Sequence, residues 1–567
     1  MVWTAGGVGM TGAQTFYADQ GESWTESRRI EFYFKDQGSR IMPLAWMRAL
    51  TLPTGEAFLH DALARYGYLS DENAPERGVP VGFTIAPAST GPAIGMTCAA
   101  CHTRQIVVNG LALRIDGGPA MVDFQAFLSD LDAAMGRALQ DDTSFASFAT
   151  RVLGPEASSD AQAELKESAE LWHLRFSTLM ARSLPDPAWG PGRLDAVSMI
   201  FNRVAGLDLG EPPSMLIPEN IEKADAPTRY PFLWNAGRQD MTQWPGFAAN
   251  GSDLLALSRN LGEVYGVFGE FQPVKQSGGL LRLDRDYVKN NSANFDGLRD
   301  LEDLIWQIGP PRWPWEIDEE MAAKGEKIFN RSSESGGCVD CHGIKTGEVR
   351  DPFRRTWATP IKDVGTDARE CAILLREVKT GVLAGAKLPF LPERIGQQTD
   401  KAFTVLSTSV IGAIVQHAFG NRSDAAAKEL EGLDELPPEF DALREAFPSA
   451  DDLTGMFEAV DGGCPYEARV LQGIWASAPY LHNGSVMSLA DLLKPASERT
   501  KSFKLGPNYD IETVGLAVEQ TAFDYTLNTT GCDEIDSGNS RCGHEYGTEE
   551  SLTPKERTAL LEYLKTL

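Results

Sequence analysis

One short string, Cys-x-x-Cys-His, occurs twice in this chain and constrains it more than any other feature. The two copies span residues 98–102 and 338–342. Two cysteines at this spacing can each form a thioether bond to one vinyl group of a haem, and the adjacent histidine can then bind the iron. The sequence therefore predicts two covalently bound c-type haems. Their attachment and proximal ligand residues are Cys98, Cys101, His102, Cys338, Cys341 and His342.

Paired cysteines can also bind zinc or form a redox disulfide, so these interpretations must be weighed against haem. A zinc site built from the four cysteines would leave both adjacent histidines without a role. The chain contains seven histidines in 567 residues. Two of the seven in the same short string favour haem.

The charge of the chain limits its partners. Its 52 Lys and Arg residues oppose 80 Asp and Glu residues, a formal net charge of −28. A surface this acidic repels nucleic acid and anionic lipid, and the basic residues form no compensating stripe. No run of about 18 apolar residues is present either. The sequence thus predicts neither a nucleic-acid partner nor a membrane span.

Helical patterns flank the second motif. Asp318 is a suitable N-cap for a helix whose apolar stripe ends at Phe329. Thr553 and Glu556 form a capping box at the start of a terminal helix with a leucine-lined face. Strand-like alternation is scarce, and the predicted fold class is mainly α with little β. An entry helix, a Cys-x-x-Cys-His loop and a closing helix resemble the cytochrome c fold, which implies two cytochrome c-like haem domains with long loops and insertions. Further helical spacing occurs at residues 121–140, 160–183, 252–268, 401–419 and 424–446.

Two stretches rich in Pro and Gly, residues 70–92 and 309–315, indicate domain boundaries. They divide the chain into an N-terminal extension (1–90), a first haem domain with the active site (91–308) and a second, electron-transfer haem domain with an insertion (309–567). The extension is expected to pack on the first haem domain.

Two c-type haem motifs in one chain of this size resemble the di-haem cytochrome c peroxidase/MauG superfamily. Within it, the chain is most similar to the branch of latex-cleaving di-haem rubber oxygenases, and the resemblance spans nearly the whole chain. Such a resemblance implies cofactor and fold more directly than it implies substrate. The strings that carry it are residues 37–40, 97–102, 114–120, 231–234, 478–485 and 543–548.

The sixth iron position decides what each haem can do, because an iron with two strong protein ligands transfers electrons, whereas an open iron can bind an oxidant. The bacterial peroxidases of this superfamily place a displaceable histidine shortly after the first motif. Here no histidine lies between His102 and His173. The first haem is therefore predicted to be open, and His173, in an apolar helical pattern, is interpreted as a core residue.

For the second haem the peroxidases use a methionine soon after a Tyr-x-His-x-Gly string. This chain has the string at residues 480–484 but no methionine near Pro495, so a histidine is the expected ligand. By resemblance to the rubber oxygenases this ligand is His544. His482, which also suits a haem propionate or loop contact, and His417, which also suits packing, remain alternatives.

Trp234 and Glu263 are the predicted functional side chains besides the ligands. By resemblance, Trp234 stands for the tryptophan that lies between the two haems in this superfamily, with a buried core tryptophan as the open alternative. Glu263 is the candidate distal general base, against the alternative of a solvated or salt-bridged acid. An apolar substrate cavity near the first haem is expected to draw on Phe232, Trp244, Phe247 and Phe268.

Four cysteines lie outside the motifs, and three pairings of them are open. Attachment of c-type haem takes place outside the cytoplasm, where disulfides persist. Cys532 and Cys542 enclose a short loop ahead of His544, so a bridge there would pin the ligand-bearing segment. Cys371 with Cys464 then follows by elimination.

These observations favour an exported, periplasmic or secreted, haem-dependent dioxygenase. The first haem, on His102, would direct dioxygen to a carbon–carbon double bond of an apolar substrate such as a polyisoprenoid or an unsaturated lipid. The second haem, on His342 and His544, would hold and supply electrons. One alternative is a peroxidase or MauG-like enzyme that uses hydrogen peroxide and an electron-donor protein. Another is a non-catalytic electron-transfer cytochrome, which the small number of histidines disfavours.

The N-terminal residues lack the charged and apolar regions of a signal peptide, and we interpret Met1 as the start of a mature chain. A calcium ion is a candidate further cofactor, although no residue pattern identifies its ligands.

Overall fold

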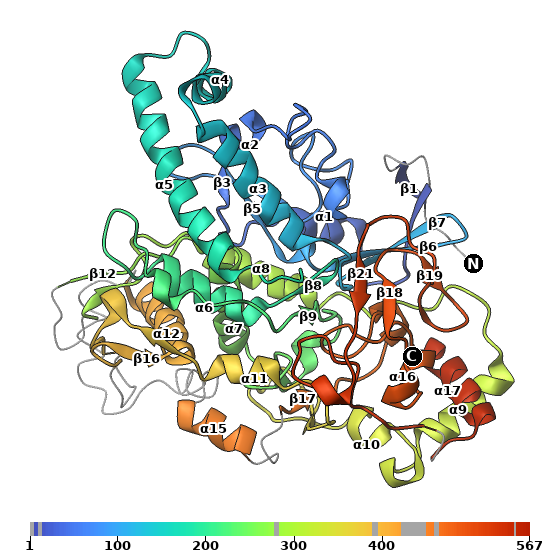
Figure 1. Ribbon diagram of the computed structural model, residues 1–567. Coiled ribbons are helices and arrows are strands. Elements are labelled where there is room, and N and C mark those ends of the chain that lie inside the picture. The colour runs from blue at the N-terminus through green and yellow to red at the C-terminus, as the bar shows by residue number, and fades with distance from the viewer. Residues whose placement is uncertain are drawn as a thin grey trace.

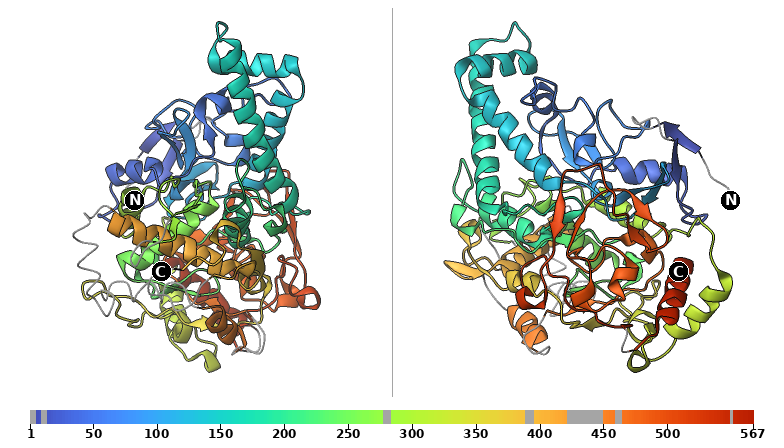
Figure 2. Two further views of the ribbon diagram at one scale, coloured as in Figure 1. Left: turned by 90° about the vertical axis from the view of Figure 1, so that its left-hand side faces the viewer. Right: turned by 45° about the vertical axis from the view of Figure 1, so that its right-hand side comes forward.

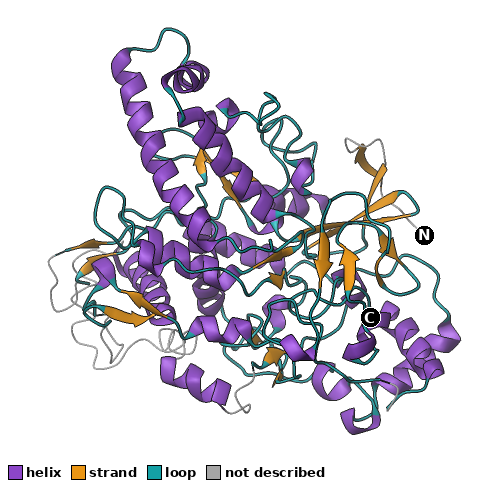
Figure 3. Cartoon of the chain, in the orientation of Figure 1, coloured by secondary structure: helices purple, strands orange, loops and turns teal. Residues whose placement is uncertain are grey.

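Figure 1 shows the computed structural model of the chain, which describes residues 5–8, 14–276, 283–387, 395–420, 449–458, 464–548 and 551–567. Helices and short strands are joined by long loops, drawn in teal in Figure 3. The helix expected at 424–446 lies outside the described residues. None of the described helices is long and apolar enough to cross a membrane.

Helices form at the other predicted positions. Asp123, Ser158 and Ser252 cap three of them, because each side chain accepts a hydrogen bond from a backbone N–H of the first turn. The predicted helices are α3 (Phe124–Leu139), α5 (Ser159–Ser183), α7 (Asp253–Gly266) and α12 (Ala402–Gly420). Further helices are α1 (Glu26–Phe34), α4 (Asp142–Leu153), α6 (Ala196–Leu207), α8 (Phe295–Ile305) and α15 (Ala450–Glu458).

A pair of helices flanks the second motif, as predicted. α9 (Glu319–Phe329) begins at the Asp318 cap, and α17 (Pro554–Thr566) begins at the Thr553 capping box. The two helices pack against each other at the lower right of Figure 1. Their close approach requires a glycine, because a Cβ atom at Gly325 would lie 2.0 Å from the carbonyl oxygen of Ala559.

The prediction of two cytochrome c-like domains with little β structure is wrong. The described residues form a four-stranded sheet, a three-stranded sheet and several two-stranded ladders. The four-stranded sheet has the order β1 (Ala5–Val8), β2 (Gln14–Tyr17), β7 (Leu111–Asp116), β6 (Thr103–Val108), with β2 parallel to β7. The first motif therefore runs directly into a strand, without the helix pair found at the second. The three-stranded sheet has the order β3 (Met42–Pro43), β5 (Ala93–Met96), β4 (Phe83–Ala86).

The hairpin formed by β6 and β7 accounts for much of the β structure that was not predicted from the sequence. β6 and β7 are joined by Asn109 and Gly110, whose φ angles are 51° and 80°. Asn-Gly is the preferred pair for the tight hairpin turn that needs two left-handed residues. In β7, however, the alternation of apolar and polar residues that would indicate a strand is weak, because β7 is buried along almost its whole length.

One buried apolar cluster connects the two motif regions. It contains Trp24 of the N-terminal segment, Ile106 beside the first motif, Phe232, Trp234 and Leu560 of α17. In the right view of Figure 2 the N-terminal (blue) segments lie directly above the C-terminal (red) segments, and Trp24 and Leu560 belong to the same cluster. The two motif regions thus share a core, and the three-segment division of the chain stays a prediction.

Candidate functional site

Each Cys-x-x-Cys-His motif opens onto its own cavity. The first cavity has an empty volume of about 1470 Å³ and the second about 1380 Å³, both including their openings to solvent. The structure therefore brings all six predicted attachment and proximal residues to two cavities. Cys98, Cys101 and His102 line the first cavity, and Cys338, Cys341 and His342 line the second.

The two proximal histidines are held in the same way. Nδ1 of His102 lies 2.9 Å from the carbonyl oxygen of Pro231, and Nδ1 of His342 lies 2.7 Å from that of Arg469. Because a carbonyl oxygen only accepts, Nδ1 carries the proton and Nε2 keeps its lone pair. Burial lowers the pKa of His102 to about 4 and also lowers the pKa of His342. Both rings are therefore neutral and able to bind a metal ion through Nε2.

His544 faces His342 across the second cavity. The two ring centres are 6.2 Å apart, and burial lowers the pKa of His544 to about 3, so this ring is neutral too. A metal ion lies about 2 Å from a coordinating imidazole nitrogen, so two rings with one ion between them have centres roughly 6 Å apart. In the described part of the chain, Nδ1 of His544 is buried without a hydrogen-bond partner. This geometry fits one haem iron held by His342 and His544.

The loop that carries His544 is fixed from several sides. Arg499 is 1% exposed and donates hydrogen bonds to the carbonyls of Arg541 and Gly543, at 2.7 Å each, and of His544, at 3.2 Å. The Cys532–Cys542 disulfide closes just before the loop, which confirms this predicted pairing. His544 itself has a left-handed φ of 54°. Non-glycine residues adopt this conformation at a cost, and they do so preferentially at functional sites.

Glu263 faces the first cavity from α7. Its carboxylate accepts a hydrogen bond from Nε2 of Gln243 at 2.9 Å, and burial raises its pKa. Glu263 is solvent-accessible and is one of the residues that line this cavity. Among the described residues that line this cavity, His102 is the single histidine, and two methionines, Met96 and Met199, line it as well. The first site therefore combines one proximal histidine with a carboxyl group able to hold or release a proton.

A common wall separates the two cavities. The guanidinium carbon of Arg469 lies 3.9 Å from the ring centre of Phe232, and that of Arg229 lies 4.8 Å from the ring centre of Trp244. These cation–aromatic contacts stabilise the partition between the cavities. The residues that line both cavities are Arg229, Phe232, Trp244, Glu467 and Arg469.

Trp234 lies behind this wall. Its fully buried indole stacks on Phe232 with 4.7 Å between ring centres, and Nε1 donates to the carbonyl of Gln472 at 2.8 Å. Trp244 lines both cavities, although sequence reasoning placed it beside the first one only. No feature of the local sequence predicts which of Trp234 and Trp244 lines the cavities. The bridging role of Trp234 stays a prediction.

The other predicted residues lie in varied places. His482 lines the second cavity, where its ring stacks on Tyr466 with 4.0 Å between centres. His417 stacks on Phe295 at 3.9 Å, which fits packing. His173 on α5 lies 3.3 Å from Asp132. Phe247 lines a smaller chamber beside the first cavity, and Phe268 stacks on Phe176 in the core.

The second disulfide, Cys371–Cys464, is also the predicted one. It ties α11 (Arg369–Leu374) to the segment that enters β17 (Tyr466–Glu467). Glu370 on α11 and Glu467 on β17 both line the first cavity. The bond therefore fixes two residues with carboxyl side chains in the cavity wall.

Loss of Cys371–Cys464 should destabilise the protein more than loss of Cys532–Cys542. The bridges join residues 93 and 10 positions apart, and the chain-entropy model gives about 4 to 5 kcal/mol for the long loop and about 3 kcal/mol for the short one. We expect Cys371→Ser with Cys464→Ser to lower the free energy of unfolding in urea by about the larger amount. Equal losses for the two double variants would contradict this ranking.

The residues present fit a c-type haem at each motif. A haem iron needs at most two protein side chains, because the porphyrin nitrogens occupy its remaining positions. Arg229 and Arg469 line both cavities and offer buried cationic groups for haem propionates. Nε of Arg469 has no hydrogen-bond partner in the described structure. The described residues contain no group of three or more His, Cys, Asp or Glu side chains placed to hold a metal ion, so no calcium site is assigned.

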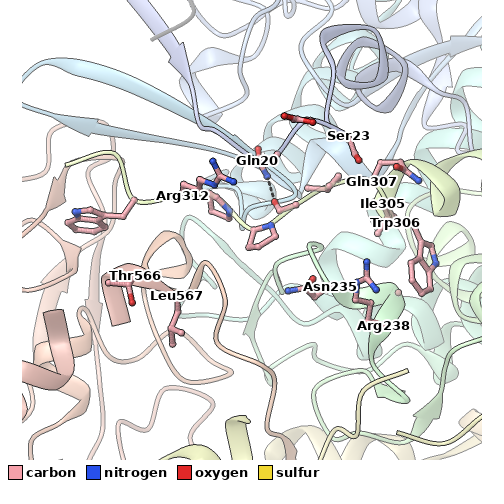
Figure 4. Close-up of a pocket in the computed structure, with 18 of the residues that line it drawn as sticks. Gln20, Ser23, Asn235, Arg238, Ile305, Trp306, Gln307, Arg312, Thr566 and Leu567 are labelled. Carbon is pink, nitrogen blue, oxygen red and sulfur yellow. Dashed lines mark hydrogen bonds between the residues drawn. The ribbon is translucent and has the colours of Figure 1, made fainter. Parts of the chain in front are cut away.

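A third cavity, of about 1390 Å³, contains none of the predicted site residues among its described lining. Four separate segments of the chain meet there, represented by Gln20, Asn235, Arg312 and Leu567 (Figure 4). Gln20 joins two of these segments by donating to the carbonyl of Gly309 at 3.0 Å. This groove is a junction between segments, and the candidate haem sites are the other two cavities.

Residues 465–504 match the family model described as RoxA-like, cytochrome c-like. This stretch contains Glu467 and Arg469 of the common wall and His482 of the second cavity. The match supports the relation to the rubber oxygenases and identifies a cytochrome c-like, haem-type segment.

Two relatives come from Sinorhizobium fredii. "Uncharacterized protein y4iJ" is 29% identical over 604 residues, which covers 96% of this chain and 92% of the relative. "Uncharacterized protein y4iM" is 24% identical over 379 residues, which covers 66% of this chain and 68% of the relative. Neither name states an activity.

Proposed function

We propose that this chain is an exported di-haem oxidoreductase that adds dioxygen to a carbon–carbon double bond of an apolar substrate, such as a polyisoprenoid or an unsaturated lipid. In this reaction the double bond is cleaved and each carbon takes one oxygen atom as a carbonyl. Both atoms of dioxygen are used, so no external reductant is consumed.

The observation that carries this proposal is the difference between the two cavities. The second cavity has an opposed pair, His342 and His544, whose ring centres are 6.2 Å apart. The described lining of the first cavity offers His102 as its one histidine, together with the aromatic rings of Phe232 and Trp244. A site with two histidine ligands suits electron storage, and a site with one suits binding of a small oxidant.

Each side chain then has a defined task. Cys98, Cys101 and Nε2 of His102 would hold the first haem, which when bound supplies the iron that activates the oxidant. Glu263 would accept or return a proton at its carboxyl group, whose pKa is raised by burial. Phe232 and Trp244 would exclude water from the reacting double bond.

The two disulfides support an oxidising compartment, and covalent haem attachment points to the same place. We therefore propose a periplasmic or secreted location. A polymeric or small apolar substrate is the expected partner.

The test is product analysis under isotopically labelled dioxygen. The purified holoprotein is mixed with dispersed squalene and ¹⁸O₂, and carbonyl products are analysed by mass spectrometry. We expect cleavage products whose new carbonyl oxygens both derive from dioxygen. Turnover that requires hydrogen peroxide and an electron donor would instead establish the peroxidase or MauG-like alternative. Two low-spin haems with no reaction towards either oxidant would establish an electron-transfer cytochrome.

Glu263→Gln should lower turnover by about 100-fold or more, because a positioned general acid or base contributes a factor of this order. Its amide keeps the shape of the side chain but cannot exchange a proton. We expect the absorption spectrum of the first haem to be retained. Glu270→Gln, on an exposed acid, is the matched control. Unchanged turnover in Glu263→Gln would remove this residue from the mechanism.

Trp234→Phe should slow electron transfer between the haems several-fold if Trp234 is the bridge. The rate is measured by flash photolysis of the half-reduced, CO-bound protein. Trp244→Phe is the comparison, because Trp244 lines both cavities. A rate that falls in Trp244→Phe alone would move the bridging role to Trp244.

A further inference from the structure

Glu370 is a buried acid in the wall of the first cavity, and the proposed reaction does not use it. It lies on α11 next to the Cys371–Cys464 disulfide and lines the cavity together with Glu467. In the part of the chain that the structure describes, Oε2 of Glu370 is buried without a hydrogen-bond partner. A carboxylate in such a place has no donor to replace its lost hydration, so the neutral acid is favoured.

Three other acids interact with Glu370, and each of them has hydrogen-bond donors. They are Asp195, Asp367 and Glu467. Asp195 and Asp367 each accept hydrogen bonds from two backbone N–H groups, at 2.6 to 3.0 Å. Glu467 accepts one from Nε2 of Gln239 at 3.0 Å. Of these four acids, Glu370 is therefore the one whose surroundings most favour a bound proton.

Burial and the neighbouring charges act on Glu370 in the same direction. Burial contributes most, the three acids add to it, and together they raise the pKa of Glu370 well above its ordinary value. The other ionisable side chains of this segment and of β17 bond to different partners. These pairs are Arg369 with Asp225, Arg376 with Asn202, and Tyr466 with the carbonyl of Asp367.

The charge of the first site should control whether Glu370 ionises. Glu370 lines the same cavity as His102, the proximal residue of the first motif. An oxidised haem at this motif supplies a net positive charge that stabilises a carboxylate, and reduction removes that charge. Charges inside a protein interact strongly, because little water screens them. An electron at the first site should therefore raise the proton affinity of Glu370.

We propose that Glu370 compensates the charge of the first site, taking up one proton when the site gains an electron and releasing it when the electron leaves. The electron comes from the haem of the second cavity, and the proton converts the carboxylate of Glu370 to the neutral acid. The net charge of the site then stays constant. This inference goes beyond the proposed function, because it requires a haem at the first motif but no particular oxidant or substrate.

The experiment is a spectroelectrochemical titration of the holoprotein at several pH values. The reduction potential of the first haem should fall as the pH rises, by up to about 59 mV for each tenfold fall in proton concentration, because one proton accompanies one electron. Glu370→Gln keeps the size of the side chain but cannot exchange a proton, so this dependence should disappear. Glu377→Gln, on an exposed acid that follows α11, is the matched control and should behave as wild type.

Infrared difference spectra of the reduced and oxidised protein give a second readout, which a merely structural role would not change. Reduction should produce the C=O stretch of a newly protonated carboxyl group, and this band should shift in D₂O. It should be absent in Glu370→Gln and present in Glu377→Gln.

Persistence of both the pH dependence and the infrared band in Glu370→Gln would overturn the proposal. Their loss in Glu263→Gln, with Glu370→Gln unchanged, would assign the proton to Glu263 instead. Neither readout involves turnover, so failure of the dioxygenase reaction leaves this test intact. Conversely, dioxygenase activity with a first-haem potential that is independent of pH would support the proposed function and contradict the role of Glu370.

Discussion

Replacing Cys98 and Cys101 together by serine is expected to remove one of two covalently attached haems. The thioether bonds of a c-type haem form through these sulfur atoms, and serine cannot replace them. Intact-mass spectrometry of the denatured protein should show a loss of one haem mass. The haem absorbance per chain should fall to about half.

The complementary variant, Cys338→Ser with Cys341→Ser, should remove the other haem and leave the first attached. Cys532→Ser with Cys542→Ser serves as the control, because these cysteines form a disulfide and should leave both haems in place. A wild-type mass equal to the bare polypeptide would overturn the haem assignment. If only one of the two motif variants loses a haem, the haem assignment holds for that motif alone.

Replacing His544 by alanine should convert one haem from low-spin to high-spin. The ring centre of His544 lies 6.2 Å from that of His342, and the loop that carries it is held by Arg499 and by a disulfide. Removal of the imidazole leaves the second iron with one protein ligand. The change is read from electron paramagnetic resonance and from the visible spectrum of the oxidised protein.

His417→Ala is the matched control for this experiment, because the ring of His417 stacks on Phe295 and does not contribute to the described lining of either cavity. Its low-spin signal should be retained. An unchanged spectrum in His544→Ala would exclude His544 as a ligand, and His482, which lines the same cavity, would be the next residue to replace.

The site residues separate into those that local sequence identifies and those that it does not. The motif cysteines and histidines are recognisable because the chemistry of haem attachment demands one short spacing. His544 was reached by resemblance, and its neighbour Arg499, which holds the loop, carried no signal at all. Its role arises from three carbonyls that the fold brings within reach of one guanidinium.

The positions of Trp234 and Trp244 relative to the wall between the cavities could not be predicted from the local sequence. Both stand in one short stretch of chain between the motifs, yet one packs behind Phe232 and the other lines both cavities. Which tryptophan reaches the wall depends on the path of the backbone and on the partners of each indole. Trp234 donates to the carbonyl of Gln472, and Trp244 donates to the carbonyl of Arg229 at 3.1 Å.

Local sequence is sufficient to predict the local features of this protein: the two Cys-x-x-Cys-His motifs, the capped helices α9 and α17, and the helical segments with a clear apolar stripe. These depend on interactions within a few residues, such as the Thr553 to Glu556 capping box. Contacts between distant segments set how the two motifs share a core, which side chains form the wall between the cavities, and how the hairpin after the first motif is buried. Burial and side-chain contact depend on segments hundreds of residues apart, and no local periodicity encodes them.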